Sequence, residues 1–324
     1  MKKIIISFLT LAVMGCTKVN EEIVENIIEK YPKAVEENSV SYYLEEDKPI
    51  LALKKSDERF IAISQYDNSI FLGVETTTED KKSYSIQKLD TQNGNLTQII
   101  ADLSHIKDIA ISDKFIFVTQ NKTVRAYNKN TYELEVIIGN GNQNDQNFGM
   151  FNTQALFLTN SHLLVRDEKR IRFFNLADIT ASNTKKVPTF LKTEVYSGNV
   201  SSITIHNNKL FMLRDLNGNK TIDFFDLNEK GFISENQLRT NFFSVASYQE
   251  QLFSFRNHLY SSLKEKGLGK LDEKANIEHQ YKSHNNNPLQ VQRFVFTQDK
   301  LYITNQNGGE ISVFKVKDIV YRKY

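Results

Sequence analysis

The sequence has no tryptophan, a single cysteine and no apolar run long enough to cross a membrane. Without a second cysteine the chain cannot form an internal disulfide, so the fold must depend on its core alone. The missing tryptophan weakens the case for a sugar-stacking site, although 14 Tyr and 22 Phe could supply aromatic faces. A Gly-rich phosphate loop, a Gly-x-Ser-x-Gly elbow and a His-Glu-x-x-His motif are also absent. No familiar catalytic motif therefore marks this chain as an enzyme.

The sequence also lacks an excess of charge of either sign. Its 41 Lys and Arg residues stand against 39 Asp and Glu. Without the first 15 residues, which hold Lys2 and Lys3, the balance is 39 to 39. Such a balance gives no general attraction to nucleic acid or to anionic lipid, so we predict no nucleic-acid partner.

Residues 1–15 have the pattern of a signal peptide. Lys2 and Lys3 precede an apolar run from Ile4 to Met14, which is shorter than the roughly 20 residues of a transmembrane helix. The following Val13-Met14-Gly15-Cys16 resembles the lipobox of bacterial lipoproteins. The resemblance implies cleavage before Cys16, a diacylglycerol thioether on Cys16, and acylation of the new amino group, for example with palmitate. The alternative is an ordinary signal peptide beside an incidental cysteine, which we disfavour because every part of the lipobox is present in order.

Lipidation of Cys16 predicts a protein that is anchored to a membrane of the cell envelope but does not span it, since two or three acyl chains make a stable anchor. It would also consume the only thiol, which excludes thiol catalysis. Thr17, in place of Asp after the cysteine, is compatible with an outer membrane, on its periplasmic or its surface face. We expect residues 16–45 to form the lipid tether and linker. Ile23, Ile27 and Tyr31 follow helical spacing up to Pro32, which indicates a short helix or a loose spacer, with a partner-binding helix as the alternative.

Residues 46–324 repeat one pattern: an alternating apolar strand, a polar turn and a second apolar strand, as in FIAISQYDNSIFLGV and DIAISDKFIFV. The first apolar residue after each turn is assigned to Ile70, Ile116, Leu163, Leu210, Leu252 and Leu301, at spacings of 46, 47, 47, 42 and 49. A third strand, such as KTVRAYNK or KTIDFFDL, and a fourth follow in most copies. Four short strands in about 40 to 50 residues are typical of one β-propeller blade. We therefore predict an all-β fold, a six-bladed β-propeller with four-stranded antiparallel blades.

The two ends of this region complement each other. The last copy stops after its third strand, whereas PILALKK (Pro49–Lys55) is an additional strand ahead of the first copy. We predict that this N-terminal strand completes the last blade and closes the ring. Closure would remove an exposed strand edge, which otherwise promotes aggregation.

The third copy, Gly139 to Leu176, resembles the NHL repeat. It has Gly139 and Gly141, then Phe151-Asn152, then Leu164-Val165-Arg166-Asp167, and finally Arg170-Ile171-Arg172-Phe173-Phe174. The proline that is usual before the inner strand is absent. The chain also looks like six-bladed propeller lipoproteins of bacterial surfaces, a resemblance that concerns the fold more than any activity.

The stretch RDLNGNKTIDFFDL could be a calcium loop or a hairpin. Asp215, Asn217 and Asn219 occupy the first ligand positions of an EF-hand loop, but Lys220 stands where that loop needs glycine. The segment from Ile222 also aligns with the third strands of other copies, and Asn-Gly is a favoured hairpin turn. We predict the hairpin and disfavour calcium. His279 and His284 could share a metal in EHQYKSHNNNPLQ, but a solvated loop is the preferred interpretation.

Ligands of propellers usually lie over the central channel, at the loops that lead into the innermost strands. The repeat phase assigns these positions to Arg59, Asp108, Gln154, Ser202, Ser244 and Arg293, with their immediate neighbours. Their mixture of two arginines, one acid and neutral groups could hold a polar or anionic ligand, or it could only hydrate a wet channel. We assign no catalytic, cofactor-binding or metal-binding residue.

Two functions fit the sequence. The preferred one is a lipid-anchored cell-envelope propeller that binds or scaffolds a protein or glycan partner. The alternative is a propeller enzyme, a metal-dependent hydrolase or lyase with its site at the channel mouth. The enzyme requires at least three carboxylate, Asn or His ligands that converge there, and only Asp108 among the aligned positions clearly provides one.

Overall fold

The computed structural model describes residues 42–47, 51–52, 57–79, 81–142, 149–150, 152–167, 170–180, 191–194, 199–233, 241–245, 249–264, 266–281, 289–305 and 309–318. Cys16, the predicted signal peptide and most of the predicted tether lie outside these residues, as do Phe151 and His284. Within them, no helix is long and apolar enough to span a membrane.

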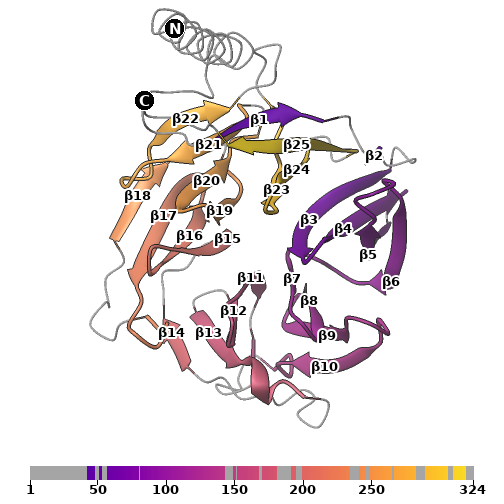
Figure 1. The fold of residues 1–324 in the computed structure, drawn as a ribbon. Helices are drawn as coiled ribbons and strands as arrows, with labels where there is room; N and C mark the ends of the chain where they lie inside the picture. Colours follow the sequence, from indigo (N-terminus) through magenta and orange to yellow (C-terminus); the bar gives the residue numbers. More distant parts are fainter. Residues whose placement is uncertain are drawn as a thin grey trace, which may run out of the picture.

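Six antiparallel sheets are arranged around a central axis, and each forms one blade of a propeller (Figure 1). Blades 1 to 3 follow in chain order: β3 (Glu58–Tyr66), β4 (Ser69–Thr78), β5 (Lys81–Leu89) and β6 (Leu96–Leu103); β7 (Ile109–Ile111), β8 (Phe115–Gln120), β9 (Thr123–Asn128) and β10 (Leu134–Ile138); β11 (Thr153–Leu158), β12 (His162–Asp167), β13 (Arg170–Asn175) and β14 (Leu191–Glu194). Blades 4 and 5 comprise β15 (Asn199–His206), β16 (Lys209–Leu216), β17 (Asn219–Asp226) and β18 (Asn241–Val245), then β19 (Leu252–Phe255), β20 (His258–Ser262), β21 (Leu268–Leu271) and β22 (Ile277–Tyr281). Blade 6 comprises β23 (Arg293–Phe296), β24 (Lys300–Thr304), β25 (Glu310–Asp318), β1 (Tyr42–Glu46) and the short β2 (Leu51–Ala52). The predicted six-bladed antiparallel propeller is confirmed: five blades have four strands, and in blade 6 β1 and β2 together take the place of the fourth strand.

The hydrophobic core lies between the blades. The described residues form six clusters of buried apolar side chains, and each cluster combines residues of two neighbouring blades. Between blades 3 and 4, for example, Leu164 and Phe173 pack with Leu210 and Phe225. A single four-stranded sheet cannot bury both of its faces, so the blades are stable only as a ring.

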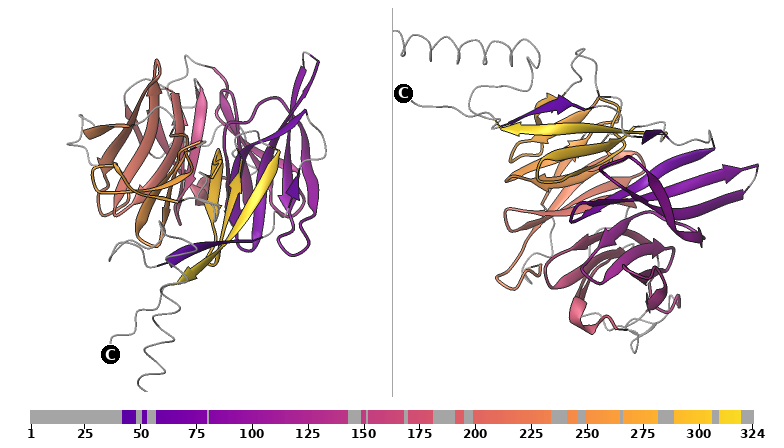
Figure 2. Two further views of the ribbon diagram at one scale, coloured as in Figure 1. Left: turned by 90° about the horizontal axis from the view of Figure 1, so that it is seen from above. Right: turned by 45° about the vertical axis from the view of Figure 1, so that its right-hand side comes forward.

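The N-terminal strands close this ring. β1 and β2 both pair with the outer side of β25, with Leu44 opposite Val316 and Leu51 opposite Ile311 (Figure 1 and Figure 2). The predicted pairing of the two chain ends is confirmed, with Leu51–Ala52 as the described strand within the predicted PILALKK segment. The longer contribution comes from Tyr42–Glu46, so the outer strand begins within the segment that we assigned to the linker.

The predicted fifth inner hairpin is wrong. We assigned Ser244 to the start of its first strand and Leu252 to its second strand, but Asn241–Val245 is the outer strand of blade 4, and Leu252–Phe255 is the inner strand of blade 5. The inner turn of blade 5 is Arg256-Asn257, where both residues have positive φ. Ser244 therefore lies on an outer strand and not at the channel.

The stretch around Asn217 is a hairpin, as predicted. Leu216 pairs with Asn219, and Asn217 and Gly218 form the turn with φ of 54° and 86°. The carboxylate of Asp215 accepts the Gly218 N–H at 2.9 Å. Asp223 is fully buried on β17, where Arg214 Nε contacts its carboxylate at 2.6 Å. The hairpin follows from strand alternation together with an Asn-Gly pair that tolerates positive φ.

The residues that carry the NHL resemblance serve packing within blade 3. Asp167 and Arg172 are both buried, and their side chains meet at 3.0 Å. The other Asp167 oxygen accepts the Asn152 N–H at 3.0 Å, and Arg172 also donates to the carbonyl of Gly149. This buried ion pair fixes the segment before β11 against β12 and β13.

Candidate functional site

Two connected cavities follow the axis of the ring. The channel, a cavity of about 300 Å³, is lined by the inner strands of all six blades, including Asp108, Ser202 and Arg293. The mouth is a cavity of about 510 Å³ at the end where the inner strands begin. It is lined by Arg59, Ile61, Glu75, His105, Ile106, Lys107, Gln154, Asn199, Val200, Ser201, Asp215, Lys220, Glu250, Gln292 and Arg293. Ser201 and Arg293 line both cavities, and the mouth receives side chains from all six blades.

The predicted channel-mouth residues other than Ser244 lie on these cavities. Arg59 and Gln154 line the mouth, Asp108 and Ser202 line the channel, and Arg293 lines both. They come together because each stands at or just before the start of an inner strand. The repeat period therefore places these residues at the mouth end of the ring in every blade whose inner hairpin is assigned correctly.

Several of these side chains connect neighbouring blades. In each case a side-chain oxygen near the start of one inner strand accepts a backbone N–H from the next inner strand along the ring. The pairs are Asp108 with Leu156 at 2.8 Å, Gln154 with Val200 at 2.9 Å, Ser202 with Leu252 at 3.1 Å and Gln251 with Phe294 at 2.7 Å. Asp108, Gln154 and Ser202 therefore have a structural role in the ring, in addition to facing the cavities.

Asp108 is the acidic residue among those that line the channel. Burial raises its pKa to about 6, against smaller opposing effects of the backbone N–H groups of Leu156 and Ile109 and of the Arg293 guanidinium. Its two oxygens accept those N–H groups at 2.8 and 2.9 Å. The carboxylate is therefore held within the wall by the backbone.

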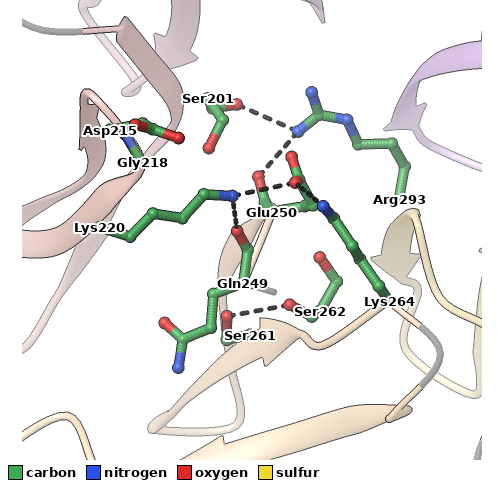
Figure 3. Close-up of polar contacts among 10 residues, drawn as sticks. All are labelled: Ser201, Asp215, Gly218, Lys220, Gln249, Glu250, Ser261, Ser262, Lys264 and Arg293. Atoms are coloured by element: carbon green, nitrogen blue, oxygen red, sulfur yellow. Dashed lines mark hydrogen bonds and ion pairs between the residues drawn. The ribbon is translucent and has the colours of Figure 1, made fainter. Parts of the chain in front are cut away.

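Arg293 reaches from blade 6 across the mouth to blades 4 and 5. Its Nη1 donates to the carbonyls of Ser201 at 3.0 Å and Glu250 at 3.2 Å (Figure 3). Both acceptors are neutral, so these bonds position the guanidinium without neutralising its charge. Figure 3 shows its second terminal nitrogen pointing away from the two carbonyls.

Two carboxylates at the mouth each lie between two cations. Glu75 contacts Arg59 at 2.7 Å and Lys82 at 3.2 Å. Burial alone would raise the pKa of Glu75, but Lys82 and Arg59 hold it below its usual value. Glu75 therefore stays ionised, and its one negative charge faces two positive charges.

The second of these carboxylates, Glu250, contacts Lys220 at 2.9 Å and Lys264 at 3.0 Å (Figure 3). Burial opposes ionisation here too, but the two ammonium groups keep the pKa of Glu250 below its usual value. Lys220 is almost fully buried and also donates to the carbonyl of Gln249.

Lys107 and His105 line the side of the mouth next to blade 2. The Lys107 ammonium donates to Asn152 Oδ1 at 2.8 Å, and burial lowers its pKa. His105 packs edge-on against Tyr84 with ring centroids 5.5 Å apart. Burial lowers the pKa of His105, and the neighbouring Lys107 charge adds to this effect, so the imidazole is neutral at physiological pH.

Sequence reasoning missed Glu75, Lys220 and Glu250, and it included Lys107 only as a neighbour of Asp108. Glu75 and Lys220 lie on second and third strands, whose hairpin turns reach the same end of the ring as the starts of the inner strands. The available signal was the lysine that precedes or begins several third strands, as in KTVRAYNK and KTIDFFDL. Alternation along the strand alone does not show that such a lysine meets a carboxylate of another blade.

Within the part of the chain that the structure describes, no group of three His, Cys, Asp or Glu residues is placed to hold a metal ion. We predicted that His279 lies in a solvated loop, and this prediction is wrong. His279 is buried on β22, with its ring centroid 4.6 Å from that of Tyr281. Ile277, His279 and Tyr281 lie on one face of the strand, which continues to Tyr281. The polar residues between and after them hide this alternation in the sequence.

No protein-family model matches the sequence, and no curated protein matches it. Solved structures resemble it in fold. A catalytically inactive His-to-Ala variant of virginiamycin B lyase from Staphylococcus aureus, with quinupristin, has a TM-score of 0.54 and 12% identity, over 85% of this chain and 99% of that one. The WD40 domain of Toxoplasma gondii coronin has a TM-score of 0.50 and 11% identity, over 87% of each chain. At such identities the likeness concerns architecture alone, and it agrees with the β-propeller fold described above.

Proposed function

We propose that the protein is a lipid-anchored binding module of the cell envelope, which holds a protein or glycan partner at the channel mouth. The observation that carries this proposal is the mouth itself, where charged and amide side chains from all six blades converge on one cavity of about 510 Å³. Binding sites are typically concave and have a few polar groups fixed by a rigid scaffold. Here the ring of inter-blade hydrogen bonds provides that scaffold.

The position of the first described strand supports an anchor on the opposite face. Tyr42 pairs with Asp318 at the end of β25 that lies away from the mouth, whereas Ala52 pairs with Glu310 at the mouth end. A chain that comes from a lipid on Cys16 would thus reach the propeller on the face opposite the mouth. That arrangement directs the mouth away from the membrane and toward a partner.

Lipidation is tested on the full chain expressed in a bacterium. Mass spectrometry of the N-terminal peptide should find diacylglycerol on Cys16, and the protein should fractionate with membranes. A Cys16→Ser variant should lose both properties. A wild-type chain that is recovered unmodified and soluble would contradict the proposed anchor.

Partner binding is tested by capture from the native envelope with a variant that blocks the mouth. Asn199 is exposed and lines the mouth, so Asn199→Trp should fill the cavity and remove only the long contact of 3.5 Å from Gln154 Nε2 to Asn199 Oδ1. Asn160→Trp is the control, because Asn160 is exposed in the β11–β12 turn on the opposite face. We expect a stoichiometric partner that is lost with Asn199→Trp and kept with Asn160→Trp. Prior protease or glycosidase treatment of the envelope distinguishes a protein from a glycan, and equal capture by both variants would contradict a site at the mouth.

The alternative is a lyase or hydrolase that uses the same mouth. His105 favours it, because a neutral imidazole beside a cavity is suited to act as a general base. In the structurally similar lyase, a His-to-Ala variant is catalytically inactive. Metal analysis of the captured sample tests this alternative: a stoichiometric bound metal would support the enzyme over the binding module, and a metal-free sample would contradict a metal-dependent enzyme.

A further inference from the structure

The charges around the mouth do not balance. Arg59 and Lys82 together face one carboxylate, Glu75. Lys220 and Lys264 together face another, Glu250. Each group of three side chains therefore carries a net positive charge, and it does so next to the same cavity.

Two further cations line the mouth with neutral hydrogen-bond partners. Lys107 donates to the side-chain carbonyl of Asn152, and Arg293 donates to two backbone carbonyls. Within the described residues no carboxylate lies within ion-pair distance of either cation. A cation that is partly removed from water without a counterion is stabilised when an anion approaches it.

The remaining carboxylates do not cancel this excess. Asp215 accepts the N–H of Gly218 in its own hairpin turn. Asp108 lines the channel below the mouth, is half-buried, and its oxygens hold two backbone N–H groups. Among the residues that line the mouth, four cations (Arg59, Lys107, Lys220 and Arg293) thus face three carboxylates (Glu75, Asp215 and Glu250), and Lys82 and Lys264 add positive charge beside Glu75 and Glu250.

The position of Asp108 also limits how far an anion can enter. Its charge lines the channel below the mouth, so a second anion there would meet like-charge repulsion. At the mouth itself an anion lies in the cavity that the ammonium of Lys107 and the guanidinium of Arg293 line. The guanidinium is held by Nη1 alone, which leaves its other edge available for a bidentate contact with a carboxylate or phosphate.

We infer that the ligand of this propeller bears an oxyanion, a carboxylate or a phosphate, which the mouth binds between Lys107 and Arg293. This inference rests on the proposed function, since it identifies the chemistry that the binding mouth recognises. It does not require a metal or a catalytic step. A neutral sugar lacks the group that these two cations select.

The test is direct titration of the folded protein, monitored by NMR, with galacturonate, inorganic phosphate and neutral galactose. We expect galacturonate or phosphate to shift resonances of mouth residues in a saturable and salt-sensitive manner, and galactose to produce no such shift. The anion that binds with the higher affinity indicates whether the natural group is a carboxylate or a phosphate. Equal binding of galactose and galacturonate would overturn the inference.

Variants then connect binding to the two cations. Lys107→Gln removes one charge at a partly exposed site, and we expect about 10-fold weaker anion binding, as for loss of a charge-assisted hydrogen bond. Arg293→Gln should weaken it at least as much, with its thermal melt measured because Arg293 also bonds two carbonyls. Lys114→Gln, an exposed lysine in the β7–β8 turn on the opposite face, should leave binding unchanged. If Lys107→Gln binds the anion as wild type does, the inferred site is wrong.

The two proposals fail in different ways. Loss of partner capture in Asn199→Trp, with no anion bound by wild type up to millimolar concentration, would overturn the oxyanion inference and leave the binding module intact. Anion binding that is lost in Lys107→Gln, together with partner capture that Asn199→Trp does not affect, would support the oxyanion site and contradict the partner-binding mouth.

Discussion

Single side chains connect the inner strands of this ring. Asp108, Gln154, Ser202 and Gln251 differ in chemistry, but each offers an oxygen to a backbone N–H of the next blade. Each inner strand pairs with its own blade on one side only, so the N–H groups along its other edge have no partner within the blade. A buried N–H without an acceptor is costly, so these positions favour residues with a side-chain oxygen.

Replacement of Gln154 tests this role. Gln154→Ala leaves the buried N–H of Val200 without its acceptor, and we expect a loss of about 1–3 kcal/mol in the free energy of unfolding. Gln98→Ala on β6 removes the same atoms from an exposed position, and its effect should be within about 0.5 kcal/mol. Chemical denaturation of both variants provides the measurement. Equal stability of the two variants would show that the bond to Val200 contributes nothing.

Asp108 makes stability depend on pH. Its folded pKa of about 6 lies above its ordinary value of 3.8, so the folded state binds the proton more tightly than the unfolded state does. The resulting stabilisation is fully present below about pH 4 and is lost as the pH rises through 6. Relative to Asp108→Asn, which has no proton to lose, wild type should lose up to about 3 kcal/mol between these pH values.

The comparison is made as a difference between two pH series of urea denaturation. Glu75 and Glu250 have lowered pKa values, and they therefore add stability as the pH rises from the acid side. These contributions occur in both proteins and cancel in the difference. A difference that stays constant from pH 4 to pH 7 would mean that Asp108 titrates normally.

At the scale of strands and hairpins, five of the six inner hairpins could be predicted from the repeat. The fifth could not, because Asn241–Val245 and Leu252–Phe255 both alternate and lie on either side of a polar segment, like a true hairpin. The real turn at Arg256-Asn257 adopts positive φ without glycine, so it carries no strong turn signal. With Leu259 as the fifth reference residue, the last two spacings become 49 and 42, which shows that loop length varies between blades.

The same limit applies to the mouth. Positions at the start of inner strands follow from the period, and Arg59, Gln154 and Arg293 were found in that way. Glu250 was not found, because it precedes the mis-assigned blade. The ion pairs of Glu75 and Glu250 depend on side-chain direction and on the packing of adjacent strands, which a periodic pattern does not contain.

The β16–β17 hairpin gives a prediction about a turn at the mouth. Gly218 has φ of 86°, where an added Cβ is strained although no neighbouring atom lies within 4 Å. Gly218→Ala should therefore cost about 1 kcal/mol of stability from backbone strain alone. Gly309→Ala is the matched control, because its Cβ would also meet no atom and its φ is not positive. Denaturation midpoints check this, and equal losses in the two variants would exclude backbone strain as the cause.

At the scale of the whole molecule, the ring depends on contacts between ends of the chain. Each of the six apolar clusters lies between two blades, so no blade has a complete core of its own. Blade 6 is the one blade that is assembled from both ends, with β1 and β2 on the outer side of β25. Separation of β1 would expose the hydrogen-bonding edge of β25 along much of its length, a surface that favours aggregation.

Leu44 tests how much this closure contributes. Its side chain is 5% exposed and packs in the cluster between blades 5 and 6, with Phe314 and Val316. Leu44→Ala should lower the free energy of unfolding by about 2–5 kcal/mol and speed amide exchange along β25, because the outer strand loses its buried contact. Leu134→Ala on β10 is the control, since Leu134 is 42% exposed and also lies on an outer strand, but on one that does not close the ring. If the two variants lose similar stability and β25 exchanges at the wild-type rate in both, the ring is held by the contacts between blades, and the pairing of the chain ends adds little.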